Sequence, residues 1–272
     1  MSTTVSEVIA ATEQLWPSTG AESWDAVGLV AGDLDAPVTR IVLAVDAVLD
    51  TVDEAISADA DMLITHHPLL LRGVTSIASD RYKGAVLTQL IRAKCALLAA
   101  HTNADVVETG TSGRFAAKLG LTDIAPIVAG ENPDRGIGRT GMLPEAMTLG
   151  RLARLLGEIL PATATGIRVA GDFDQVVQSV ALCGGAGDAY LNDPAVLASD
   201  VYITSDLRHH PASEARENAR LMRGPALIDV SHWASEWLWL DAAAEELREL
   251  LPAVTITVSE LRTDPWDFAV VQ

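Results

Sequence analysis

The stretch "DMLITHHPLLLRG", residues 61–73, is the part of the sequence from which the fold can be inferred. It opens as an apolar run typical of a buried strand, and it places His66, His67 and Pro68 where that strand should end. Similar apolar runs recur along the chain and predict strands at 40–46, 62–65, 95–101, 179–183, 201–204 and 226–230. Amphipathic stretches between them predict helices at 4–15, 48–58, 82–93, 112–119, 149–160, 190–198, 211–221 and 232–251. This alternation predicts an α/β fold with largely parallel, buried strands.

A polar segment rich in turn-forming residues, 129–143, interrupts the alternation near the middle of the chain and indicates loops and a hairpin. We therefore expect two α/β lobes, residues 1–125 and 126–272, with one continuous domain as the alternative. The lobes share a pattern, because "DMLITHHP" at 61–68 resembles "DVYITSDLRHHP" at 200–211. This similarity indicates either two related units or a chance likeness between strand ends.

Composition excludes several classes of function. The 272 residues carry a net charge of −18, which argues against binding to nucleic acid or to anionic membranes. A small anionic substrate is still compatible with this charge, because bound cations can reverse its sign locally. The longest apolar runs are too short to cross a bilayer, and the N-terminal residues do not have the pattern of a signal peptide. We expect Cys95 and Cys183 to be reduced core thiols of a cytoplasmic protein.

All six histidines lie in or beside four motifs, each after a predicted strand, where α/β folds build their sites. In "THHP", neighbouring side chains no longer alternate between faces once the strand has ended, and Pro68 favours an extended His67. Both His66 and His67 can then face one centre, although an exposed loop is the alternative. In "HTNAD", His101 and Asp105 suit a divalent metal, but Asp105 could instead cap a helix.

The motif "DVSHWASE", residues 229–236, adds a third pair of candidate ligands. His232 and Glu236 are four residues apart on a predicted helix, so they lie on one face about one turn apart. An ordinary pair on a helix surface is the alternative. The nearby Trp233, Trp237 and Trp239 are expected in the core or at a subunit interface.

Taken together, these motifs supply three imidazoles and two carboxylates. The candidate metal ligands are His66, His67, Asp105, His232 and Glu236. Five ligands are too many for one tetrahedral zinc with an open position, and they suit two divalent ions (Zn, Fe, Mn or Co) bridged by a carboxylate and a hydroxide that acts as nucleophile. His101 and His210 are expected to support the ligands through hydrogen bonds or to transfer protons.

Other catalytic schemes fit poorly, because the sequence has no Walker A motif, no G-x-S-x-G elbow and no cysteine beside a suitable histidine. The glycine-rich "CGGAG", residues 183–187, follows a predicted strand and precedes a helix. It is compatible with an anion cradle at a helix N-terminus or with a tightly packed turn.

Several motifs occur in the order and spacing of a known family. They are "SWDAVGLVAGD", "THHPLLLRG", "HTNADVVETGTSGRFAAKLGL", "GIGRTG", "CGGAGDAYL", "DVYITSDLRHHPASEA" and "DVSHWASE". From Ser23 to Glu236 the chain resembles the Nif-three-like proteins, catalogued as GTP cyclohydrolase 1 type 2 homologues, in their short form without an inserted middle domain. One departure is Ala26, where the family commonly has Asn.

The resemblance implies a two-lobed α/β subunit, a dinuclear metal centre in the cleft between the lobes, and a homohexamer. It assigns the same five metal ligands, with His101 and His210 as additional site histidines. The leading hypothesis is a metal-dependent hydrolase of a small nucleotide- or pterin-like substrate. A non-catalytic metal-binding scaffold or regulatory oligomer is the alternative, and a structural site with a single metal is a third.

Overall fold

The computed structural model describes residues 3–130, 132 and 135–270, which form two compact units. The first unit comprises Met1–Ala104 with Leu240–Thr263, and the second comprises Asp105–Trp239 with Asp264–Gln272. The seam expected at residues 125–126 therefore lies inside the second unit. The reason is that the strand at Thr122–Ala125 pairs with the strand at Arg139–Thr148, so the chain continues one sheet across the predicted boundary.

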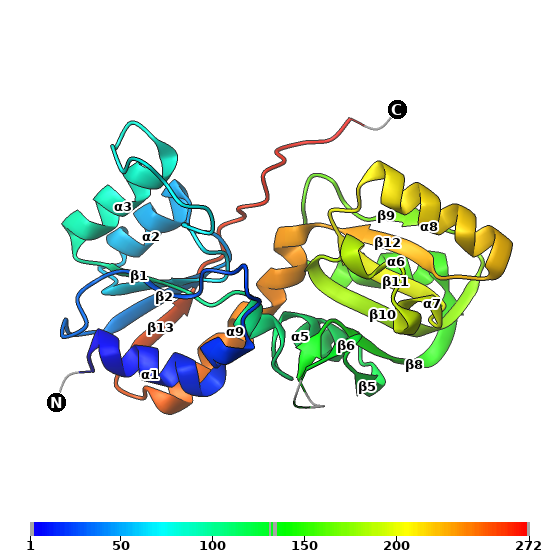
Figure 1. Ribbon diagram of the computed structural model, residues 1–272, viewed down its shortest axis with the longest axis horizontal. Coiled ribbons are helices and arrows are strands. Elements are labelled where there is room, and N and C mark those ends of the chain that lie inside the picture. Colours follow the sequence, from blue (N-terminus) through cyan, green and yellow to red (C-terminus); the bar gives the residue numbers. More distant parts are fainter. Residues whose placement is uncertain (1–2, 131, 133–134, 271–272) are drawn as a thin grey trace. The chain divides into compact units, whose positions relative to one another are not determined.

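The first unit is built on a five-stranded sheet in the order β1-β4-β3-β2-β13. Its strands are β1 (Gly28–Ala31), β2 (Arg40–Ala44), β3 (Met62–Thr65), β4 (Ala96–Ala99) and β13 (Thr255–Val258). Four neighbouring strands run parallel, and β1 joins β4 in an antiparallel pair. Its helices are α1 (Val5–Leu15), α2 (Leu49–Ser57) and α3 (Tyr82–Ala93). Figure 1 shows α2 and α3 over one face of this sheet and α1 over the other.

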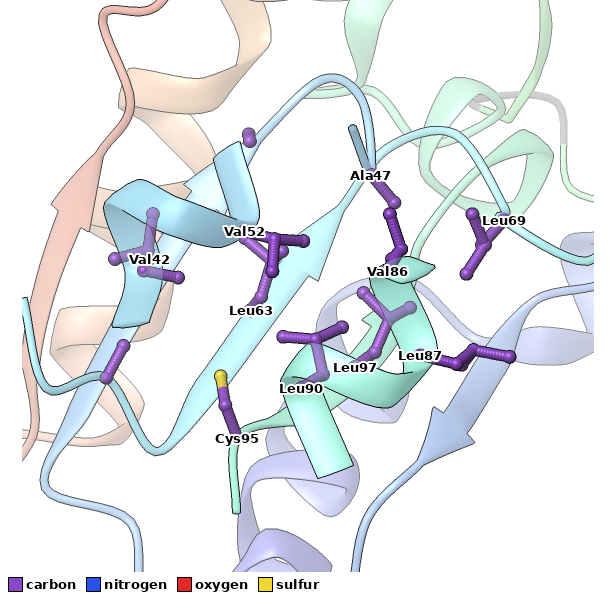
Figure 2. Packing of buried hydrophobic residues seen from close by; sticks show 13 residues of the cluster. Val42, Ala47, Val52, Leu63, Leu69, Val86, Leu87, Leu90, Cys95 and Leu97 are labelled. Atoms are coloured by element: carbon purple, nitrogen blue, oxygen red, sulfur yellow. The ribbon is translucent and has the colours of Figure 1, made fainter. Parts of the chain in front are cut away.

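The core of the first unit forms because β3 and β4 are buried along their whole length, as sequences without polar alternation predict. Val52 of α2 and Leu90 of α3 pack there against Leu63 and Leu97 of the sheet (Figure 2). Cys95 lies in the same cluster as a free thiol whose pKa is raised to about 12 by burial. The prediction of a buried core thiol is confirmed for Cys95, and Cys183 is likewise free and buried in the second unit.

The second unit contains a six-stranded sheet in the order β5-β8-β10-β11-β12-β9. Its strands are β5 (Thr122–Ala125), β8 (Arg139–Thr148), β9 (Arg168–Ala170), β10 (Val176–Ala186), β11 (Val201–Ser205) and β12 (Ala226–Val230). The central strands β10, β11 and β12 are parallel, and the other pairings are antiparallel. A further pair, β6 (Val128–Ala129) and β7 (Gly136–Ile137), forms the hairpin expected in the turn-rich segment.

The helices of the second unit lead into these strands or connect them. They are α5 (Thr111–Lys118), α6 (Leu149–Ile159), α7 (Pro194–Leu197) and α8 (His209–Met222). The chain passes between the units in α4 (Thr102–Asp105) and in the long α9 (His232–Leu250). Helices α5 and α6 contact β8, and α8 contacts β12. No helix within the described residues is long and apolar enough to cross a membrane.

The α/β class and every predicted strand are confirmed. Two of the predicted helices differ locally. The helix expected at 190–198 is only the short α7, because Asp193 caps a helix that starts at Pro194. Helix α8 begins at His209 instead of residue 211, so both histidines of "RHHP" lie in its first turn. Pro211 is tolerated there, because the first-turn N–H groups of a helix have no partner within it.

Candidate metal centre

His66 and His67 directly follow β3, and their backbone continues the pairing of that strand with the β2 side of the sheet. The His66 N–H donates to the Ala44 carbonyl (3.0 Å), and the His67 N–H donates to the Val45 carbonyl (2.8 Å). The two rings nevertheless lie close together, with centroids 5.2 Å apart and planes inclined by 40°. The prediction that adjacent imidazoles converge beyond the strand end is confirmed.

His101 follows β4 and joins the same cluster. Its ring centroid lies 5.2 Å from that of His66 and 5.5 Å from that of His67. One ring nitrogen from each of the three histidines lies within 4.8 Å of the others, a spacing that suits a shared metal ion. Parallel strands end at one edge of a sheet, so β3 and β4 bring residues 66, 67 and 101 together. His101 was predicted for proton transfer, and the structure places it among the ligand candidates.

Each ring of this cluster is oriented by an oxygen acceptor at Nδ1. The His66 Nδ1 donates to the Ala100 carbonyl (2.8 Å), because a carbonyl can only accept. The Nδ1 atoms of His67 and His101 bond to carboxylates, Asp46 Oδ1 at 2.7 Å and Asp25 Oδ1 at 2.9 Å. This arrangement makes Nε2 the ring nitrogen that can coordinate a metal, and it is the support typical of metal-bound histidines.

Asp25 supports His101 from a loop that precedes β1. Its carboxylate accepts hydrogen bonds from the Thr102 N–H (3.0 Å), the Thr102 hydroxyl and the Ala26 N–H (2.7 Å) as well as from His101. Burial by itself would raise the pKa of Asp25, but the hydrogen bonds from Thr102 and His101 outweigh it and lower that pKa. Asp25 is therefore a carboxylate at neutral pH. Ala26 takes part through its backbone N–H.

Replacing Asp46 by Ala is expected to weaken divalent-metal binding by about 10- to 100-fold, because the His67 ring would lose the acceptor that orients it. The Thr263 hydroxyl, which also donates to Asp46, would lose the same partner. Calorimetric titration of the metal-free protein with Zn²⁺ measures this change. Asp53→Ala, which removes an exposed carboxylate on the following helix α2, is the matched control. Equal affinities in the two variants would show that Asp46 does not orient the ring.

The second unit contributes a histidine and a carboxylate from the start of α9. His232 Nε2 lies 2.9 Å from Glu236 Oε1, as the four-residue spacing predicts. The His232 Nδ1 lies 2.7 Å from Asp206 Oδ2, so this ring has the same type of support as those of the first unit. Glu236 is only 3% exposed, and burial of a carboxylate requires a compensating cation or proton.

The electrostatic environment of the His232–Glu236 pair favours a bound cation. Burial alone would lower the pKa of His232, but the carboxylates of Glu236 and Asp206 outweigh it and raise that pKa well above its ordinary value. Without a metal, the ring therefore carries a proton between two carboxylates at neutral pH. A divalent ion can replace this proton, so the donor chemistry fits the metal that the sequence predicts.

The glycine-rich "CGGAG" turn is packed against these ligands. Gly185 has φ +70°, and a Cβ placed on it would lie 2.4 Å from Glu236 Oε1 and 3.3 Å from His232 Nε2. Its N–H donates to the Ser235 hydroxyl (2.9 Å). Of the two interpretations of this motif, the structure therefore supports the tightly packed turn.

Asp105 lies at the end of α4, four residues after His101. It accepts a hydrogen bond from the hydroxyl of Thr111, which begins α5. Two contacts from the "GIGRTG" segment hold the residues after Asp105. The Gly136 N–H donates to the Val106 carbonyl (2.8 Å), and Arg139 Nη2 donates to the Val107 carbonyl (2.6 Å).

The buried Arg139 explains the "GIGRTG" motif. Its Nη1 also donates to the carbonyls of Gly136 and Gly138, both at 2.6 Å. The turn folds around the guanidinium, which needs φ +64° at Gly138. Burial lowers the pKa of Arg139, while the nearby Glu108 and Asp105 favour its charged form. The motif thus fixes the backbone that follows a candidate ligand.

Arg139→Met is expected to lower the free energy of unfolding by about 3 kcal/mol, because three backbone carbonyls would lose a charged donor. Urea denaturation measures the change. Arg151→Met, at an exposed position of α6, serves as the control and should unfold like the unaltered protein. A loss below about 1 kcal/mol would contradict this account of the motif.

His210 lies in the second unit. It is exposed in the first turn of α8, with its ring centroid 5.2 Å from that of His209. Among the described residues, neither belongs to a group of three or more candidate metal ligands. Proton transfer by His210 stays a prediction. Trp233 and Trp239 are buried, in agreement with the expected core position.

The carboxylates that orient the rings were not predicted from the sequence. Asp25, Asp46 and Asp206 are separated from their histidines by 76, 21 and 26 residues, respectively. Asp46 and Asp206 follow β2 and β11. Acidic residues at or just beyond the ends of predicted strands were therefore the available signal. Asp25 lies in the "SWDAVG" motif, but its partner depends on how the loop before β1 meets the end of β4.

Comparison with known proteins gives matches that extend across both units. A family model described as Duf34/NIF3 (NGG1p interacting factor 3) matches residues 3–265. A Streptomyces coelicolor protein named "GTP cyclohydrolase 1 type 2 homolog" is 46% identical over 269 residues, which cover 96% of this chain and 93% of that protein. A Clostridium perfringens protein of the same name is 31% identical over 270 residues, which cover 97% and 99%.

Solved structures show the same fold. A Staphylococcus aureus hypothetical protein superposes with a TM-score of 0.89 and 26% identity over 99% of this chain and 100% of that chain. A Bacillus cereus protein related to NIF3 also gives a TM-score of 0.89, with 24% identity and the same coverage. The similarity therefore includes the strand ends that carry the candidate ligands.

Proposed function

The chain belongs to the Duf34/NIF3 family, and from this premise we propose that it is a metal-dependent hydrolase of a small nucleotide- or pterin-like substrate. The observation that carries the proposal is the cluster of His66, His67 and His101, in which every Nδ1 is bonded to an oxygen. An ordinary surface histidine does not need such support at Nδ1, whereas it is typical of histidines that bind a metal. The names of the relatives support a nucleotide-related substrate.

We propose that the chain binds two divalent ions. The proposed ligands are His66, His67, Asp105, His232 and Glu236. Two features support the choice: neutral imidazoles and carboxylates suit Zn, Fe, Mn or Co, and the His232–Glu236 pair already accommodates a positive charge. When bound, the ions would lower the pKa of a water molecule and polarise the scissile bond.

His101 is the group that we assign to proton transfer. Its ring is held by Asp25, a carboxylate that stabilises the imidazolium form and would let His101 accept a proton from water and pass it to the leaving group. His101→Asn separates this role from that of a ligand. Loss of turnover with unchanged metal content supports proton transfer, and loss of metal shows that His101 is itself a ligand.

The proposal is tested by loading the purified protein with Mn²⁺, Zn²⁺ or Fe²⁺ and screening nucleotides, phosphodiesters and GTP for hydrolysis. We expect metal-stimulated turnover that is lost in the double variant His66→Asn/Glu236→Gln and kept in His209→Gln, an exposed histidine outside the cluster. Two bound metals per chain without turnover would instead support the non-catalytic scaffold. One metal per chain that survives in the double variant would exclude the two-ion site.

Assembly and location are further proposals. The family resemblance supports a homohexamer, and light scattering coupled to gel filtration measures the number of chains. The two buried free thiols are compatible with a reducing compartment, and on that basis we propose a cytoplasmic protein. The net charge of −18 supports the prediction that neither nucleic acid nor membrane is a partner.

A further inference from the structure

A pocket of about 530 Å³ lies within the second unit beside His232. Its walls include Ser231 and His232 at the start of α9, Arg168 of β9, and Trp266 and Phe268 of the C-terminal segment. It opens where β12 ends, and the carboxyl ends of parallel strands are where α/β folds bind ligands. We propose that this pocket binds the planar heterocyclic ring of the substrate, a ring rich in N–H donors. This assignment rests on the proposed function for the identity of the substrate.

The two aromatic side chains point to a ring as the ligand. Trp266 is 61% exposed and Phe268 is 80% exposed, although both line the pocket. Large aromatic side chains gain free energy when their faces are covered, and heterocyclic bases stack on such faces. A ring inserted between the sheet edge and this segment would cover apolar surface that now faces solvent.

The segment that carries these side chains is anchored beside the candidate metal ligand. The hydroxyl of Ser231, the residue before His232, donates to Asp264 Oδ2 (2.6 Å). The Trp266 N–H donates to Asp264 Oδ1 (3.1 Å), which fixes the turn in front of the indole. Ser231 is buried, so the anchor belongs to the folded unit. The aromatic wall and His232 are therefore parts of one built site.

The charge of the pocket distinguishes a ring from a phosphate. Among the described residues that line the pocket, Asp206, Asp229 and Asp264 contribute carboxylates, and Arg168 contributes a guanidinium that is paired with Asp229. This negative balance repels phosphate and attracts N–H donors, such as those on the edge of a guanine or pterin ring. The ring end of a nucleotide thus suits this pocket, and its anionic end suits a bound cation.

The test uses the metal-free full-length protein and guanosine, a neutral nucleoside with an N–H-rich ring and no phosphate. We expect calorimetry to detect guanosine binding that is about 10- to 100-fold weaker in Trp266→Ala, because a stacked base contributes roughly 1–3 kcal/mol. Phe268→Ala should also weaken guanosine binding. Val270→Ala is the control, since Val270 is 74% exposed in the same segment and lies outside the pocket walls. Ribose 5-phosphate should show no binding without metal.

Failure of this inference can be told apart from failure of the proposed function. Guanosine binding that depends on Trp266, in a protein without metal-stimulated turnover, would retain the ring pocket and remove the hydrolase. If turnover is found, Trp266→Ala should raise KM and leave kcat nearly unchanged, because stacking binds ground and transition states alike. Equal guanosine affinity in the unaltered protein and in Trp266→Ala/Phe268→Ala, or no guanosine binding at all, would overturn the inference.

Discussion

Replacing His66 by Asn is expected to lower the affinity for divalent metal by more than about 100-fold. Changes to groups that only orient a metal-bound histidine cost about 10- to 100-fold, and removal of a ligand atom should cost more. Asn places an amide nitrogen near the position of Nδ1 and can still donate to the Ala100 carbonyl, whereas it has no atom at the position of Nε2. The substitution therefore removes the coordinating nitrogen and keeps the buried hydrogen bond.

Competition with a fluorescent chelator measures this affinity, and elemental analysis gives the metal content. His66 is completely buried, so the folding of the variant must be measured by thermal denaturation without metal. His209→Asn provides the same substitution at an exposed histidine of α8 and should bind metal like the unaltered protein. A folded His66→Asn protein with full metal content would exclude His66 as a ligand.

The second large effect is expected from adding a single methyl group at Gly185. A Cβ there would lie 2.4 Å from Glu236 Oε1, which is far inside van der Waals contact, and the backbone would keep a left-handed conformation that costs an L-residue about 1–2 kcal/mol. Gly185→Ala must therefore move the Glu236 carboxylate or the turn. We expect a loss of stability of about 2 kcal/mol or more, together with a loss of metal binding.

Gly184 provides the matched control in the adjacent position. A Cβ at Gly184 would lie 3.4 Å from the nearest atoms, Thr111 Cβ and Oγ1, which is an ordinary contact distance. Gly184→Ala should therefore bind metal with nearly unchanged affinity. Chemical denaturation and metal titration of both variants make the comparison. Normal metal affinity in Gly185→Ala would mean that Glu236 does not need its present position to bind metal.

The sequence alone was sufficient to predict the local structure that carries the ligands. Apolar runs without alternation identified β2, β3 and β4, because a strand covered on both faces needs apolar residues on both. The four-residue spacing of His232 and Glu236 predicted their contact, because one helical turn sets that distance. Strands β1, β5, β8, β9 and β13 were not predicted. Their short or partly exposed sequences lack the continuous apolar pattern.

The hydrogen bonds that orient the histidine rings were decided by the tertiary structure. The sequence indicated that His66, His67 and His101 each follow a buried strand, and in the folded unit these strands are parallel neighbours. It could not determine that Asp25 and Asp46 bond to Nδ1 of His101 and His67, because hydrogen bonds between distant segments depend on where each backbone lies to within a few tenths of an ångström.

The same reason applies to the glycine and arginine motifs. Glycine is required at position 185 because the backbone there lies too close to Glu236 for a Cβ atom. Arginine is required at position 139 because its guanidinium donates to three carbonyls from two segments of the chain. Residue type and spacing report which groups are available along a strand or helix. The approach of one segment to another is set by packing of the whole unit, and only the folded structure contains it.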